Sequence, residues 1–126
     1  MGTTLFTQTA AREASYEMTQ YIAGRLTLPA TNVLVGTLPA GAVISAINTR
    51  NVTAFSGGTP VFSVGTTPTG VDIATGIANA AGTVSTVPLA ALTLPTTVPT
   101  NVYANVSGGA TAGDSVVVVE FWKPLL

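Results

Sequence analysis

The sequence holds few side chains that could catalyse a reaction. It contains no histidine and no cysteine, so it lacks the commonest general base, a Ser-His-Asp arrangement, a thiolate nucleophile and the usual nitrogen and sulfur ligands of metals. Nothing in the spacing of its carboxylates selects a pair suited to glycoside hydrolysis. We therefore expect no enzyme activity, no catalytic residues, no metal site and no cofactor. The carboxylates are Glu13, Glu17, Asp72, Asp114 and Glu120.

Three of these acidic residues have ordinary structural interpretations. Asp72 and Asp114 lie in glycine-rich stretches, where an aspartate normally accepts hydrogen bonds from the backbone amides of a turn. Glu120 alternates with Val118 and Trp122 along an apolar run. This pattern favours a charge at an interface or at a sheet edge, where it would discourage edge-to-edge aggregation.

Short motifs elsewhere in the chain predict no ligand chemistry. The glycine-rich pieces at residues 56–59 and 108–113 lack the Gly-Lys-Ser/Thr ending of a phosphate-binding loop, so we interpret them as turns. Asn51 and Asn105 each begin an N-glycosylation sequon. We treat both matches as coincidence, because the pattern is short and no secretion signal accompanies it.

Charge is sparse along the whole chain. Only 7% of the 126 residues are charged, the formal net charge is -1 and the mean hydropathy is +0.54, whereas soluble domains carry about a quarter charged residues. Part of the outer surface is therefore expected to be apolar and buried against partners, as in an assembly subunit. Nucleic acid is not an expected partner, because the few scattered basic residues provide little attraction for phosphates.

The sequence does not predict membrane insertion. Residues 1–6 form neither the basic nor the apolar region of a secretory signal, and Phe6 stands where a myristoylation signal requires Ser or Thr. The uncharged stretch between Asp72 and Asp114 is interrupted by glycine and proline. It does not supply the ~20 apolar residues of a membrane-spanning helix.

Short strands separated by turns dominate the pattern. Residues 101–107 place Val102, Ala104 and Val106 on one face, which predicts a half-buried strand. Residues 115–122 are β-branched and aromatic, which predicts a central or interface strand covered on both sides. The glycine-rich loop between them makes the two strands candidates for an antiparallel pair. Further strands are predicted at residues 32–35, 42–47, 60–65, 83–87 and 89–94, a series typical of a sandwich or barrel.

Two segments leave alternatives open. Residues 9–24 fit a helix with Thr9 as N-cap and Gly24 as terminator. Residues 16–22 also alternate as a strand, and the segment could be an extended arm ordered only against a neighbour; we favour extended structure. Residues 72–82 could form one or two helical turns, and we favour a long loop.

Several short motifs follow one another in a fixed order after Leu38. They are LPAGAV from Leu38, TAFSGG from Thr53, SVGT from Ser63 and TAGDSVVVVEFW from Thr111. This order resembles that of small structural proteins of tailed-phage virions, most of all the jelly-roll head decoration (cement) proteins. The resemblance implies a jelly-roll-like β-sandwich, commonly a homotrimer, seated on the capsid lattice where major capsid proteins meet.

The expected protein is all-β, a single-domain antiparallel β-sandwich that is jelly-roll-like and has an extended N-terminal arm. The arm or first strand region covers residues 1–25, and the sandwich covers residues 26–126. We expect a decoration protein on the outer surface of the virion that binds the major capsid protein and stabilises the phage head. The alternatives are a phage fibre or tail-associated receptor- or glycan-binding module, and a bacterial surface adhesin or pilus subunit.

Interface residues are expected near both ends of the chain, where apolar side chains occur in a sequence of low charge. The N-terminal set would add a strand to a neighbour or lie along it, and the C-terminal aromatic pair would help bury the subunit interface. These residues are Thr4, Leu5, Phe6, Thr7, Phe121 and Trp122.

Overall fold

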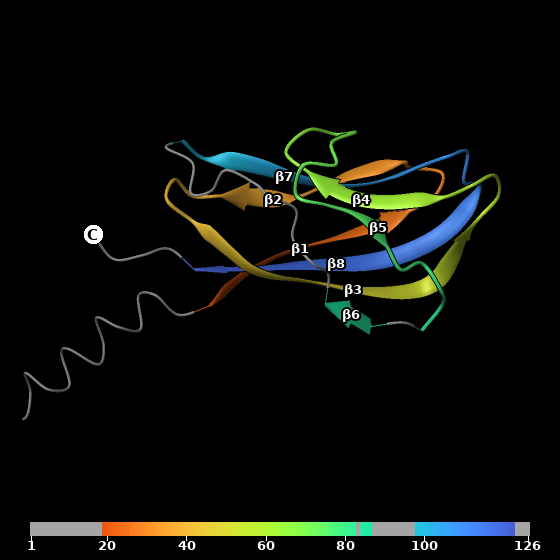
Figure 1. The fold of residues 1–126 in the computed structure, drawn as a ribbon, viewed down its shortest axis with the longest axis horizontal. Helices are drawn as coiled ribbons and strands as arrows, with labels where there is room; N and C mark the ends of the chain where they lie inside the picture. Colours follow the sequence, from red (N-terminus) through yellow and green to blue (C-terminus); the bar gives the residue numbers. More distant parts are fainter. Residues whose placement is uncertain (1–18, 83, 87–97, 123–126) are drawn as a thin grey trace, which may run out of the picture.

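The computed structural model describes residues 19–82, 84–86 and 98–122. The described residues form two four-stranded antiparallel sheets packed face to face, with strand orders β1-β8-β3-β6 and β2-β7-β4-β5 (Figure 1). The predicted all-β, single-domain β-sandwich is confirmed. The strands are β1 (Gln20–Thr27), β2 (Asn32–Leu38), β3 (Val43–Ser56), β4 (Val61–Gly65), β5 (Ala74–Ile77), β6 (Val84–Thr86), β7 (Thr100–Ser107) and β8 (Ala112–Trp122).

The pairing pattern identifies the sandwich as a jelly roll. The first strand pairs with the last, the second with the seventh, the third with the sixth and the fourth with the fifth. This is the pairing of one long hairpin, which is then rolled so that β8 also joins β3 and β7 also joins β4. Eight strands in two sheets with this connectivity are typical of jelly rolls.

β8 is the central strand of its sheet, as its apolar sequence predicts. It lies between β1 and β3 and directs Val117, Val119 and Phe121 into the core. The alternate residues Val116 and Val118 face outward and are half-buried. Among the described residues of β8, the side chains that face the core are buried, whereas those that face outward are half-buried.

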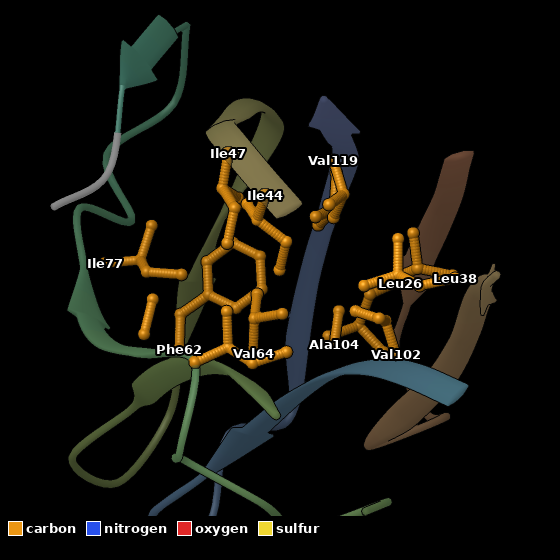
Figure 2. Close-up of a cluster of buried hydrophobic side chains, with 14 of the residues drawn as sticks. Leu26, Leu38, Ile44, Ile47, Phe62, Val64, Ile77, Val102, Ala104 and Val119 are labelled. Carbon is orange, nitrogen blue, oxygen red and sulfur yellow. The ribbon is translucent and has the colours of Figure 1, made fainter. Parts of the chain in front are cut away.

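The core fills the space between the two sheets. Figure 2 shows Phe62 and Val64 of one sheet beside Ile44 and Ile47 of the other, all buried. The rings of Phe55 and Phe62 meet edge to face, with centroids 5.0 Å apart. Each fully buried side chain of this size stabilises the fold by about 1.5–3 kcal/mol.

The predicted pairing of residues 101–107 with residues 115–122 is wrong. These segments are β7 and β8, which lie in different sheets. Both strands direct an alternating apolar face into the same core, so they face each other across the sandwich. The glycine-rich loop between them crosses from one sheet to the other. The amide of Thr59, in the loop after β3, donates to the carbonyl of Gly108, and the amide of Thr111 donates to the carbonyl of Ser56 at the end of β3.

The prediction of a loop over residues 72–82 is wrong for residues 74–77. Residues 74–77 form β5, an edge strand paired with β4. Burial of Ile73, Ala74 and Ile77 against the core holds this segment extended. The short local sequence carries little strand signal, and pairing with β4 supplies the missing stabilisation.

Extended structure is confirmed for the described part of residues 9–24, because β1 begins at Gln20. The boundary expected between residues 25 and 26 falls within β1. Residues 1–18, which contain most of the predicted arm, and the predicted strand at residues 89–94 lie outside the described residues.

One side of the sandwich is closed by a tight approach of β1 to β2. A Cβ atom on Gly24 would lie 3.0 Å from the Cα of Val35, and one on Gly36 would lie 2.8 Å from the Cβ of Ile22. Glycine at these two positions lets the backbones come this close, which brings the edges of the two sheets into contact.

Replacing Gly36 by Ala should therefore destabilise the protein by about 1–3 kcal/mol, because the added methyl group overpacks the contact with Ile22. Denaturant unfolding of Gly36→Ala, Ile22→Ala and the double variant measures the effect. The loss of unfolding free energy in the double variant should be smaller than the sum of the losses in the two single variants. The close approach of Gly36 to Ile22 would be contradicted if the two single losses of stability simply add in the double variant, or if Gly36→Ala is as stable as the wild type.

Candidate interaction surface

The outer face of the sheet formed by β1, β8 and β3 is the candidate site. Its cross-strand register forms successive rows, in which Val118 lies between Ala23 of β1 and Asn48 of β3. In the next row, Val116 lies between Arg25 and Arg50. The centre of the face is therefore aliphatic, with Asn48 beside Val118 and an arginine on each side of Val116.

A hollow of about 490 Å³ opens on this face, a volume in the range of ordinary binding pockets. It is lined by Asn48, Thr49 and Arg50 of β3 and by Val116 and Val118 of β8. The lining combines aliphatic surface with one cationic side chain. Such a surface suits protein–protein contact.

The two arginines of this face differ in their electrostatic environment. Arg25 makes a bidentate ion pair with Asp114, with Nε 2.8 Å from Oδ1 and Nη2 2.5 Å from Oδ2. Thr27 also donates its hydroxyl to Oδ1 at 2.9 Å. Among the described residues, Arg50 has no ion-pair partner. Arg25 is thus part of the β1–β8 pairing, whereas the Arg50 guanidinium is available to a partner.

Asp114 does not fulfil the predicted role of accepting turn amides. It lies within β8, and its carboxylate accepts hydrogen bonds from the side chains of Arg25 and Thr27. The hydrogen bond from Arg25 is the main cause that lowers the pKa of Asp114, against a smaller upward effect of desolvation. The same contact raises the pKa of Arg25.

The Asp114→Asn variant should melt at a lower temperature than the wild type at about pH 7, because it loses the ion pair. A carboxylate with a lowered folded pKa stabilises the protein fully above its unfolded pKa of about 3.9, and this stabilisation is lost as the pH falls through the folded value. Thermal melts across the acid range should show the difference between Asp114→Asn and wild type disappear. The control is Glu120→Gln, a carboxylate-to-amide change on the same strand at a residue that makes no ion pair with another described residue. A pH-independent deficit in Asp114→Asn would contradict this interpretation.

The opposite sheet is partly covered by its own chain. The connection between β4 and β5 folds over the outer face of that sheet, where Asn105 donates its side-chain amide to the carbonyl of Gly70 at 2.7 Å. Asp72 braces the connection by accepting hydrogen bonds from the amide and the hydroxyl of Thr66 at 2.8 and 2.6 Å. Partial desolvation raises the pKa of Asp72, but these hydrogen bonds outweigh it and the net shift is downward.

The two asparagines of the glycosylation sequons are structural. Asn51 and Asn105 are both buried, and the side-chain amide of Asn51 donates to the carbonyls of Ala78 and Ala80 at 2.8 and 3.1 Å. The backbone carbonyl of Asn51 accepts a further hydrogen bond from Gly82. Asn51 thus anchors the segment after β5, and Asn105 anchors the segment before it.

Replacing Asn51 by Ala should lower the free energy of unfolding by about 1–3 kcal/mol, because two hydrogen bonds are lost at a buried position. Residues 78–82 should also become more sensitive to protease under native conditions, since their anchor is removed. Denaturant unfolding and limited proteolysis measure the two effects. Asn32→Ala, at an exposed position of β2, serves as the control, and equal protease resistance of all three proteins would argue against the anchor.

The predicted interface residues fall in three different environments. Phe121 is only 4% exposed and packs in the core, so its ring is not free to contact a partner. Trp122 is half-buried at the end of β8, opposite Val43 of β3, and its interface role stays a prediction. Thr4, Leu5, Phe6 and Thr7 lie outside the described residues.

Sequence reasoning missed Asn48 and Arg50 as candidate binding residues. No sequence motif marks either residue, because only the pairing of β3 with β8 brings them beside Val116 and Val118. One sequence signal for this face was available, because neighbouring side chains of a strand point to opposite faces. In β8 this alternation places Val116 and Val118 on the face opposite to the core residues Val117 and Val119.

Within residues 19–82, 84–86 and 98–122, no three acidic side chains lie close enough together to hold a metal ion. In the same ranges, no helix is long and apolar enough to cross a membrane.

No model of a known protein family matches the chain, and no curated protein matches it. Its fold is similar to that of chains in three solved phage capsid structures. A chain of the cyanophage Pam1 capsid asymmetric unit has a TM-score of 0.67 at 19% identity, over 85% of this chain and 86% of that one. A chain of the acid-stable capsid of Helicobacter pylori bacteriophage KHP30 has a TM-score of 0.59 at 18% identity, with coverages of 85% and 89%. For the capsid of Ralstonia phage GP4 the TM-score is 0.55 at 18% identity, with coverages of 85% and 86%. At these identities the likeness shows a common jelly-roll fold.

Proposed function

We propose that the chain is a capsid decoration protein, which binds the lattice of the major capsid protein on the outer surface of a phage head and stabilises it. The observation that carries this proposal is the jelly roll itself. Chains with this fold, matched over 85% of the present chain, occur in three phage capsid structures. The motif order found in the sequence agrees with this assignment.

The outer face of β1, β8 and β3 has the properties that a lattice contact needs. It combines half-buried aliphatic residues and a hollow with Arg50, a cation that makes no ion pair with any residue the structure describes. A lattice stabiliser requires apolar area and hydrogen bonding but no acid, base or metal. Low overall charge also reduces the cost of burying much of the surface against partners.

Stabilisation follows from mass action. A subunit that binds the expanded shell more tightly than the open or disassembled one shifts the equilibrium by RT ln(1 + [L]/Kd) for each site. At a free concentration of about 100 times Kd, this amounts to about 2.7 kcal/mol for each occupied site. The sum over many sites makes disruption of the head rare.

A homotrimer is part of the proposal. Closed cyclic assemblies are the usual form of soluble oligomers, and each subunit then presents the same surface. Several copies of one contact act together, so a modest affinity for each contact still gives firm attachment. A trimer would also match a lattice position where three capsid subunits meet.

The proposal is tested by mixing the purified chain with expanded heads of its parent phage that lack decoration. We expect saturable binding at a copy number set by the lattice and a higher temperature of head disruption, because each bound subunit bridges neighbouring capsid proteins. Cosedimentation and thermal melting of the heads are the measurements.

Two outcomes would decide against this function. Binding to cells or glycans but not to heads would favour the fibre or tail-associated module, and assembly of the chain into strand-donated polymers would favour the adhesin or pilus subunit. The same assay on a chain lacking residues 1–10 tests the predicted role of Thr4, Leu5, Phe6 and Thr7. Unchanged binding and unchanged oligomeric state would contradict that role.

A further inference from the structure

We infer that the hollow on β3 and β8 receives an extended segment of the capsid protein that carries an aliphatic side chain beside a carboxylate. This inference rests on the proposed function and specifies the chemistry of its contact. It depends on the charge of Arg50, which has no ion-pair partner in the described part of the chain, on the aliphatic floor of the hollow and on the position of the acidic groups on the same face.

The charge of Arg50 selects a carboxylate. The described residues contain two cations, of which Arg25 is neutralised by Asp114 and Arg50 has no ion pair. A guanidinium presents donors in a planar fork that matches a carboxylate, and it is less strongly hydrated than an ammonium group. The exposed side chain of Arg50 beside aliphatic surface is therefore suited to an Asp or Glu of a partner.

The floor of the hollow selects an aliphatic neighbour for that carboxylate. Val116 and Val118 are half-buried and line the hollow from the central strand. The cross-strand neighbour of Val118 on β1 is Ala23, whose short side chain leaves the valine accessible. Covering these two valines with an aliphatic side chain removes further apolar surface from water, which favours association.

The acidic groups of the face orient the partner. Asp114 is occupied by Arg25, and Glu120 lies on β8 opposite Ala46, in the row beyond Val118. A partner carboxylate near Glu120 would be repelled, whereas one near Arg50 would be attracted. The partner segment therefore places its carboxylate at the Arg50 end of the hollow and its aliphatic side chain over Val118.

Other occupants fit this surface less well. Nucleic acid needs several cations for a stable contact, and the hollow is lined by one. A free carboxylate ion would gain little from a single exposed guanidinium in water. A protein segment gains both the ion pair and the apolar contact.

The test measures binding of the wild type, Arg50→Glu and Val118→Asp to undecorated expanded heads by cosedimentation. Each substitution should weaken binding about tenfold or more, because it places a carboxylate against the carboxylate or the aliphatic side chain of the partner. Arg50→Lys keeps the charge and should bind more tightly than Arg50→Glu. Thermal melting of each variant, compared with the wild type, identifies a loss caused by misfolding.

The matched control is Leu34→Asp, which adds a carboxylate at a 48% exposed position on the outer face of the opposite sheet. It should bind as the wild type does. If the wild type binds heads and folded Arg50→Glu and Val118→Asp bind equally well, the inference is overturned while the proposed function stands. If these variants instead change the oligomeric state of the free chain and leave head binding intact, the hollow is a contact between copies, which also overturns the inference. Failure of the wild type to bind heads would overturn the proposed function itself.

Discussion

The packing of β8 between β1 and β3 is the interaction on which the rest of the structure depends. Its inward residues Val117, Val119 and Phe121 are buried against a layer that contains β7 and β4. Because neighbouring residues of a strand point to opposite faces, the same pairing directs Val116 and Val118 outward. One strand therefore supplies the centre of the core and the floor of the candidate binding surface.

This arrangement restricts how the protein can change. A one-residue shift of β8 against β1 and β3 would exchange its two faces, which would expose Phe121 and bury Glu120. The ion pair between Arg25 and Asp114 opposes such a shift, because its bidentate geometry holds at one register. The polar contact at the edge of the face thus helps preserve the apolar pattern on which both packing and binding depend.

The two sheets differ in what they leave open. Over the sheet of β2, β7, β4 and β5, the connection before β5 is held down by Asn105, and the connection after β5 is held by Asn51 of the other sheet. The side-chain amides of these two buried asparagines are therefore engaged in hydrogen bonds within the chain. The hollow on the other sheet combines an aliphatic floor with the charge of Arg50, which no described residue neutralises. It is therefore the better candidate for binding a partner.

The sequence by itself determined the fold class and most strand positions. The alternation of apolar and polar residues at 101–107 and the apolar run at 115–122 predicted β7 and β8. Such patterns can be recognised in the local sequence, because they involve residues that are neighbours along the chain. Tertiary structure alone decided that these strands lie in different sheets, that residues 74–77 form β5 and that Phe121 belongs to the core. It also placed Arg50 beside Val116, since a contact between residues 66 positions apart depends on strand pairing, which local sequence does not encode.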